Sequence, residues 1–234
     1  MPVTGRIPTL SRGTTAEEVA AVLREMIMAG TLTPGEQLRE EGLSEQFDVS
    51  RRTIRDALGV LARERIVRHY RHKGSRVVLF SEEDIRDLYR VRRTLEAAAA
   101  RVAKKVTDAQ LKQLADAFAN LETATRSGAS DEVVRRDLEL HQAVVRLNGS
   151  ARLDEFFADI AVEMRYALSI LEATYKESAS RPEAALDEHR DICQAFLDRT
   201  PSAAARLLTE HADANEELLV RAVSQLDVTV IGRG

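Results

Sequence analysis

Hydrophobic residues recur at helical spacing over most of the chain, and this pattern predicts a mostly α-helical protein. Two short stretches differ. Residues 66–70 and 76–80 are rich in the β-branched and aromatic residues typical of strands, and they flank a basic, glycine-containing tip at residues 71–75. The pattern therefore predicts helices throughout, interrupted by one β-hairpin within the first 80 residues.

The chain after Ser81 contains no strand pattern. Ser81 is followed by three acidic residues, an arrangement close to a capping box, and it marks the start of a second domain. Turn-forming residues then separate six expected helices, at residues 82–105, 108–126, 130–147, 151–176, 181–199 and 201–226. Six successive amphipathic helices with short connections predict an antiparallel helical bundle.

The first domain has the pattern of a winged helix-turn-helix. A first helix is expected from Thr14 or Thr15 to about Ala29, and a second lies within the amphipathic stretch 38–47. After a short turn, Ser50 is a good N-cap for a third helix. The hairpin that follows provides the wing. Helix, short turn, helix and hairpin together predict a DNA-binding fold.

Basic residues concentrate where such a fold contacts DNA. Residues 51–76 contain nine arginines and lysines but only two acids. Arg51, Arg52 and Arg55 crowd the start of the third helix, where cations oppose the helix dipole, so helix stability does not explain them. A helix N-terminus with three arginines suits the major groove of DNA. The alternative is a basic face that is merely solvated.

The charge balance differs between the two halves of the chain. Residues 1–80 carry 13 basic and 10 acidic side chains, whereas residues 81–234 carry 21 and 28. This asymmetry indicates two domains with different partners, of which only the first binds DNA. The sequence has no apolar run long enough to span a membrane, no signal-peptide core and one cysteine, so we expect a cytoplasmic protein.

The first domain resembles the winged helix of the GntR family of bacterial transcription regulators. The family's usual signature is Val-Ser-Arg-Thr-Pro-Val-Arg-Glu-Ala-Leu, and residues 49–58 here read Val-Ser-Arg-Arg-Thr-Ile-Arg-Asp-Ala-Leu. Arg52 and Thr53 replace the usual threonine and proline, so the DNA site can differ from the family's common one. The resemblance covers residues 14–80 and implies DNA contacts from Ser50, Arg51, Arg52, Thr53 and Arg55, and from His72, Lys73 and Gly74 in the wing.

Three histidines on three different helices of the second domain are candidates for a metal site. His141, His189 and His211 each lie on an apolar stripe, and Asp137 precedes His141 by one turn. Buried imidazoles without partners are costly, and one ion can satisfy all four groups. Nitrogen and carboxylate ligands suit zinc first, with nickel, manganese or iron as alternatives, but not calcium. Three separate core histidines remain the other explanation.

The second domain resembles the all-helical ligand-binding domain of the FadR branch of GntR regulators. Metal-binding members of that branch use an aspartate and three histidines, which implies the metal ligands Asp137, His141, His189 and His211 here. The same resemblance implies that Arg92, on the first bundle helix, meets an acidic effector. Arg92 can instead pair with Glu96, one turn away on the same helix.

Other polar residues have weaker signals. Asn148 and Asn215 lie near the histidine stripes, where each is either a cavity-lining amide or an amide at a helix end or surface. Cys193, one turn after His189, is expected to be a small buried apolar residue, with a redox or metal role as the alternative.

These features predict a transcription regulator rather than an enzyme. We expect a homodimer that binds a palindromic operator, and a small organic acid that controls DNA affinity from the metal site. The alternatives are a metal-dependent hydrolase or lyase that uses the same four residues, and a purely structural metal. The predicted organisation is an N-terminal arm at residues 1–13, the winged helix at 14–80, the effector domain at 81–226 and a tail at 227–234.

Overall fold

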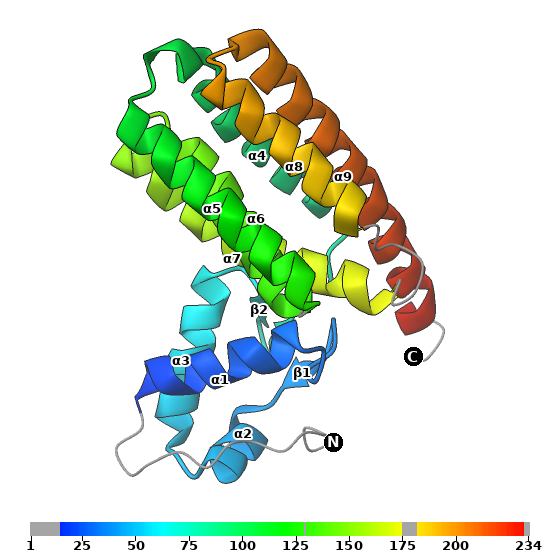
Figure 1. Cartoon of the computed structure of the whole chain (residues 1–234). Helices are drawn as coiled ribbons and strands as arrows, with labels where there is room; N and C mark the ends of the chain where they lie inside the picture. Colours follow the sequence, from blue (N-terminus) through cyan, green and yellow to red (C-terminus); the bar gives the residue numbers. More distant parts are fainter. Residues whose placement is uncertain (1–14, 129, 175–181, 232–234) are drawn as a thin grey trace. The chain divides into compact units, whose positions relative to one another are not determined.

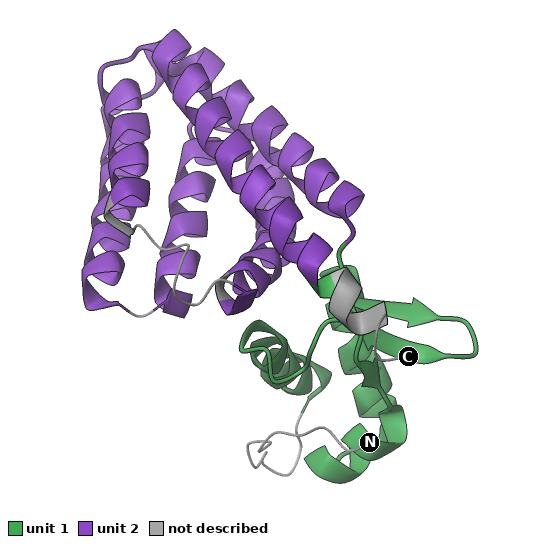
Figure 2. Cartoon of the chain, turned by 90° about the vertical axis from the view of Figure 1, so that its right-hand side faces the viewer, with its two compact units in different colours: residues 1–80, 226–234 green, residues 81–225 purple. Residues whose placement is uncertain are grey.

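A computed structural model describes residues 15–128, 130–174 and 182–231 (Figure 1). The chain divides into two compact units, residues 1–80 with 226–234 and residues 81–225 (Figure 2). The expected N-terminal arm lies outside the described residues. None of the described helices is long and apolar enough to cross a membrane.

The first unit combines three helices with a small sheet, as the sequence predicts. The helices are α1 Ala16–Met28, α2 Glu40–Phe47 and α3 Arg51–Arg63, and the strands are β1 Gln37–Leu38, β2 Val67–Tyr70 and β3 Gly74–Val77. The strands form an antiparallel sheet in the order β1-β3-β2. The two-residue strand β1 was not predicted, because it exists only through its pairing with the distant β3.

The turn between α2 and α3 is held by specific local contacts. Asp48 adopts the left-handed conformation with φ 52°, which aspartate tolerates better than most residues. The Ser44 hydroxyl donates to the Val49 carbonyl at 2.6 Å, and the Ser50 hydroxyl accepts from the Thr53 amide at 3.1 Å. The helix-turn-helix prediction and its N-cap are therefore confirmed. Ile54, together with the other apolar residues of its stripe, faces the core of the unit.

The tip of the wing is shorter than the sequence pattern indicates. The second strand was expected at residues 76–80, but β3 begins at Gly74 and ends at Val77. His72 and Gly74 both have positive φ values, 62° and 76°, so the chain reverses within residues 71–73. The ladder consequently extends to the pair Tyr70–Gly74.

The second unit is a bundle of long helices, in agreement with the predicted order. They are α4 Glu82–Val102, the 3-10 turn η1 Ala103–Lys105, α5 Asp108–Ser127, α6 Ser130–Arg146, α7 Ala151–Thr174, α8 Pro182–Leu197 and α9 Pro201–Ile231. A capping box starts α4, in which the Ser81 hydroxyl accepts from the Asp84 amide and the Asp84 carboxylate accepts from the Ser81 amide. The boundary expected at Ser81 coincides with the start of this bundle.

The last helix runs further than predicted. A tail was expected from residue 227, but α9 continues to Ile231. Between Pro201 and Gly232 the sequence contains no glycine or proline, so nothing local stops the helix earlier.

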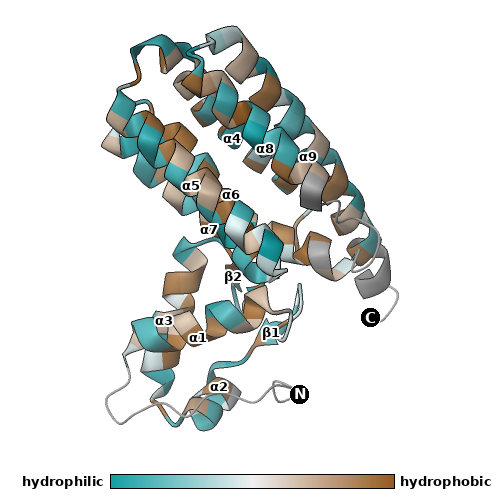
Figure 3. Cartoon of the chain, in the orientation of Figure 1, coloured by the Kyte–Doolittle hydropathy of each residue, from teal (hydrophilic) through white to brown (hydrophobic). Residues whose placement is uncertain are grey.

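Among the described residues, a cluster of apolar side chains joins the end of α4 to α5, α6, α8 and α9. Hydrophobic and hydrophilic residues alternate around its helices (Figure 3), and α5 packs against α6 and α8 while α6 also packs against α7. Phe196, Leu140 and Val144 are fully buried in this core, and Cys193 lies beside them. Burial raises the pKa of the Cys193 thiol to about 12, so this cysteine is the small apolar core residue that the sequence predicts.

Candidate functional site

The predicted aspartate and three histidines come together inside the bundle. Asp137 and His141 lie on α6, His189 on α8 and His211 on α9, and the three rings are buried. One nitrogen or oxygen atom from each residue lies within 4.8 Å of the others. The Nε2 atoms of His141 and His189 are 3.1 Å apart, and Asp137 Oδ1 is 2.7 Å from His189 Nε2. The three histidines therefore form one cluster and are not three separate core residues.

The outer nitrogens of two rings are held by hydrogen bonds, which orient the inner nitrogens. His189 Nδ1 donates to the Ala185 carbonyl at 2.6 Å, and His211 Nδ1 donates to the Glu188 carboxylate at 2.9 Å. His141 Nδ1 lies 2.8 Å from Glu96 Oε1, although the ring N–H points poorly at this oxygen. Protons held on Nδ1 leave the Nε2 atoms as the electron-pair donors that face the centre of the cluster.

Burial and neighbouring charges set the protonation of the cluster. Burial, reinforced by the Arg92 charge, lowers the pKa of His141 to about 4, so this ring is neutral at pH 7. Burial also lowers the pKa of His211. Burial would lower the pKa of His189 too, but the adjacent Asp137 carboxylate outweighs it and raises that pKa. Burial would likewise raise the pKa of Asp137, but the charges of His189 and His141 outweigh it and lower that pKa. Asp137 is therefore ionised.

A buried arginine borders the cluster. Arg92 is only 1% exposed, its Nε donates to Glu96 Oε1 at 3.0 Å, and its terminal nitrogen lies 2.6 Å from His141 Nε2. Burial would raise the pKa of Glu96, but the charge of Arg92 outweighs it and lowers that pKa to about 2. The pairing of Arg92 with Glu96, left open by the sequence, is thus present, and the guanidinium also contacts a predicted metal ligand.

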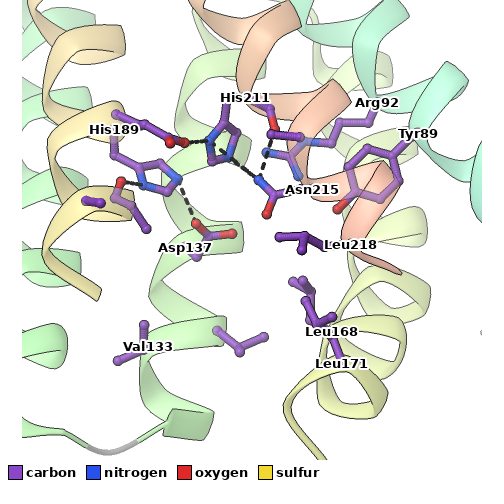
Figure 4. Close-up of a pocket in the computed structure, with 15 residues that line it drawn as sticks. Tyr89, Arg92, Val133, Asp137, Leu168, Leu171, His189, His211, Asn215 and Leu218 are labelled. Carbon is purple, nitrogen blue, oxygen red and sulfur yellow. Dashed lines mark hydrogen bonds and ion pairs between the residues drawn. The ribbon is translucent and has the colours of Figure 1, made fainter. Parts of the chain in front are cut away.

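A cavity of about 550 Å³ opens beside these residues (Figure 4). Arg92, Asp137, His189 and His211 all line it. Asn215, one turn after His211, also lines it and lies 3.1 Å from His211 Nε2. The other asparagine singled out by the sequence, Asn148, instead donates to the Val145 carbonyl at the end of α6.

The start of α3 presents its arginines to solvent. Arg52 is the most exposed, with 90% of its side chain accessible and only a 3.8 Å contact to Asp56. Arg55 pairs with Glu40 on α2 at 2.7 Å, and Arg51 pairs with Glu41. Each of the three arginines therefore has a carboxylate partner in the free protein, and the contact of Arg52 is the longest.

The wing tip is exposed, and a hydrogen bond from β1 holds its backbone. His72 and Lys73 lie in its turn, and Gly74 begins β3. The Lys73 carbonyl accepts a hydrogen bond from the Gln37 side chain at 2.9 Å, which ties the tip to β1. A side chain at Gly74 would be strained by its positive φ, so glycine suits this position.

Comparison with known proteins identifies this architecture. Residues 15–77 match the model for bacterial regulatory proteins of the gntR family, and residues 87–214 match the model for the FCD domain. The chain belongs to the GntR family of transcription regulators and carries an FCD domain. The FCD match includes all four residues of the His/Asp cluster and Arg92. The family assignment makes this a DNA-binding regulator with an effector-binding domain.

Relatives of this GntR regulator align with both units. The gluconate operon transcriptional repressor of Bacillus licheniformis is 28% identical over 206 residues, covering 87% of this chain and 84% of the relative. The transcriptional repressor RspR of Escherichia coli K12 is 26% identical over 196 residues, covering 83% and 84%. A solved GntR regulator from Rhodococcus sp. RHA1 is 28% identical with a TM-score of 0.72, covering 88% of this chain and 98% of that one.

Several polar residues of the site were missed from the sequence. Glu188 is adjacent to His189 but contacts His211 on another helix. Glu96 was considered only as a partner of Arg92, yet it also reaches His141. Tyr89 lines the cavity and was not singled out, although it lies one turn before Arg92 on α4. Its position one turn before Arg92 was the signal available for Tyr89.

Removal of Glu96 is predicted to destabilise this regulator strongly. Glu96→Ala leaves the Arg92 guanidinium buried without its carboxylate, a change that costs about 3–5 kcal/mol in comparable pairs. Glu83→Ala is the matched control, because its contact with Arg90 is 3.8 Å long and exposed, and such pairs contribute about 0–1 kcal/mol. Urea unfolding measures both, and equal losses would contradict the importance assigned to the buried pair.

Proposed function

We propose that this GntR regulator is a metal-dependent repressor that releases its operator when a small organic acid binds beside the His/Asp cluster. The convergence of three buried imidazoles and one carboxylate within 4.8 Å, at the edge of a cavity in the effector domain, carries this proposal. Repression is supported by relatives that are named repressors. We place the protein in the cytoplasm, where a bacterial operator lies, and cell fractionation tests this.

The residues present fit a divalent cation. In the arrangement described, the Nε2 of His189 faces the carboxylate of Asp137 at 2.7 Å and the Nε2 of His141 at 3.1 Å. Electron-pair donors at these distances repel one another unless a proton or a cation lies between them, and one cation would satisfy all of them together. Asp137, His141, His189 and His211 would hold the ion, and this ligand set suits zinc first, then nickel, manganese or iron. The ion would supply a Lewis acid for the oxygens of an anionic effector.

Arg92 is the second group that would bind the acid. Its terminal nitrogen now lies against His141 Nε2 at 2.6 Å. An imidazole nitrogen that binds a cation accepts no hydrogen bond, so that N–H becomes available to a ligand in the cavity that Arg92 lines. Guanidinium and carboxylate form two parallel hydrogen bonds, which favours a carboxylate effector. Arg92 therefore links metal occupancy to acid affinity.

Helix α4 would carry the signal to the DNA-binding unit. Arg92 lies on α4, which starts at Glu82, and only four residues separate Glu82 from the end of β3 at Val77. On another face of α4, Arg86 and Arg93 pair with Glu216 of α9 at 3.1 and 2.6 Å. Because α9 also carries His211, an acid that contacts both helices biases their relative positions. A coupling of about 1–3 kcal/mol would change operator affinity roughly 5- to 150-fold.

Two copies of the winged helix would bind one operator. A single unit of this size contacts few base pairs, whereas a homodimer reads two half-sites about 34 Å apart in the major groove, which makes the operator palindromic. Ser50, Arg51, Arg52, Thr53 and Arg55 would enter that groove, and His72, Lys73 and Gly74 would meet the backbone or minor groove. Light scattering tests the dimer, and a monomer at micromolar concentration with operator present would contradict it.

Substitution of the exposed arginines tests the DNA face. An arginine paired with guanine contributes about 1–3 kcal/mol, so Arg52→Ala and Arg55→Ala should each weaken operator binding roughly tenfold or more. Glu40→Gln should strengthen binding, because it frees Arg55 and removes a negative charge near DNA. The DNA used to measure affinity is a sequence that the protein has selected by binding from a pool of random DNA. Arg101→Ala, an exposed arginine in the bundle, is the control, and equal effects there would refute the assignment.

Metal removal should destabilise the effector domain. A ligand that binds only the folded state stabilises it by about 2.7 kcal/mol at a hundredfold excess over its Kd. A chelator should therefore lower the Tm of the wild-type protein, and His189→Ala should lose both the bound ion and most of this sensitivity. His72→Ala in the wing is the matched control. Full metal content in the His189→Ala protein would show that the ion is held elsewhere.

The acid response should depend on Arg92. Because Arg92 and Glu96 are buried together, we replace both, with Arg92→Met and Glu96→Gln, so that no unpaired charge remains. This double variant should keep its metal and its operator affinity but lose release by the acid, whereas Glu96→Gln alone should still respond. Operator binding is measured against acid concentration. A wild-type response in the double variant would place the carboxylate elsewhere.

A further inference from the structure

The cavity beside the His/Asp cluster has two chemically different ends (Figure 4). The polar end contains Tyr89, Arg92, Asp137, His189 and His211, with Asn215 beside them. The remaining wall is apolar apart from Glu188, which is paired with His211. It consists of Val133 and Val134 from α6, Leu168 and Leu171 from α7, Ala184 and Ala185 from α8, and Ala214 and Leu218 from α9.

The apolar wall is built from four helices and is larger than a small acid needs. The cavity volume of about 550 Å³ lies within the range of sites that enclose a whole organic ligand. Leu168 and Leu171 are only partly buried, and Leu218 is 38% exposed at the edge of the cavity. A ligand that covers these side chains removes apolar surface from water, and each methylene so buried raises affinity about fourfold.

The same wall disfavours a polyhydroxylated ligand. Apart from Glu188, which is paired with His211, the side chains outside the polar end are valines, leucines and alanines, which provide no hydrogen bond to a sugar hydroxyl. A hydroxyl moved from water to such a surface loses its partners, which costs affinity. The polar end, in contrast, has a spare group, because the Tyr89 hydroxyl is buried without a hydrogen-bond partner among the described residues. That hydroxyl can serve a second oxygen next to the carboxylate.

We propose that the effector is a 2-hydroxy or 2-oxo carboxylic acid with a branched-alkyl or phenyl tail, and not a sugar acid. The acid head lies at Arg92 and the His/Asp cluster, and the tail lies between Val134, Leu171 and Leu218. This inference rests on the proposed function and adds the class of effector to it. It separates this regulator from one that recognises gluconate, the acid in the name of the Bacillus relative's operon.

The test compares four acids that share one head. Zinc-loaded full-length protein is titrated calorimetrically with lactate, 2-hydroxyisocaproate, 3-phenyllactate and gluconate. 2-Hydroxyisocaproate has three more tail carbons than lactate, so it should bind roughly 50-fold more tightly. 3-Phenyllactate should bind at least as well as 2-hydroxyisocaproate, and gluconate should bind no more tightly than lactate. Gluconate binding as tightly as either apolar acid would overturn the inference.

A matched pair of variants tests the wall itself. Leu218→Asn keeps the side-chain size but makes the rim of the cavity polar, and it should weaken 2-hydroxyisocaproate about tenfold while lactate is unchanged. Leu197→Asn is the control, because Leu197 is similarly exposed and does not line the cavity. If Leu218→Asn shifts the oligomeric state by light scattering and leaves acid selectivity intact, the wall is a protein interface and the inference is wrong.

Failure of the proposed function gives a different result. In that case the zinc-loaded protein keeps its metal, yet none of the four acids produces heat or changes operator affinity. Failure of the present inference alone leaves acid binding intact but without preference for apolar tails.

Discussion

Imidazole nitrogens that face one another in a buried site need a proton or a cation between them, and the second unit is arranged around this requirement. The Ala185 carbonyl and the Glu188 carboxylate turn two rings inward, and Glu96 stands behind the third. Each of these partners lies on a different turn or helix from the ring it holds. The cluster is therefore a property of the packed bundle, and it can form only when α4, α6, α8 and α9 are all in place.

Helix α4 has two sets of polar contacts with different roles. Arg92 and Glu96 point into the protein, where burial makes their mutual pairing nearly obligatory. Arg86 and Arg93, whose side chains are 40% and 28% exposed, pair with the largely buried Glu216 of α9. Because Arg92 and Glu96 also contact His141, polar groups join α4 to α6 on one side and to α9 on the other. Such a helix suits a domain that must respond to a ligand.

The helices and the four cluster residues could be predicted because each depends on a pattern of residues that are close together in the sequence. His141, His189 and His211 each lie on an apolar stripe, and a stripe of helical period determines which way a side chain faces. Glu188 could not be assigned in this way, because its partner His211 is supplied by another helix. The register of the wing was missed for a related reason, since it depends on the positive φ of His72. Strand β1 exists only through a partner far along the chain.

The carboxylates that pair with the recognition helix have a consequence for how the protein searches DNA. Glu40 and Glu41 act as built-in counterions for Arg55 and Arg51. Contact with a phosphate must first exchange one ion pair for another, and it leaves a carboxylate close to the DNA. Each such contact then releases fewer net cations from DNA than a free arginine would, so the salt dependence of binding is shallower than the number of arginines suggests. If Arg51 and Arg55 contact DNA as proposed, DNA without the operator sequence would be held weakly, and the protein would remain free to find the sites where base contacts offset the exchange.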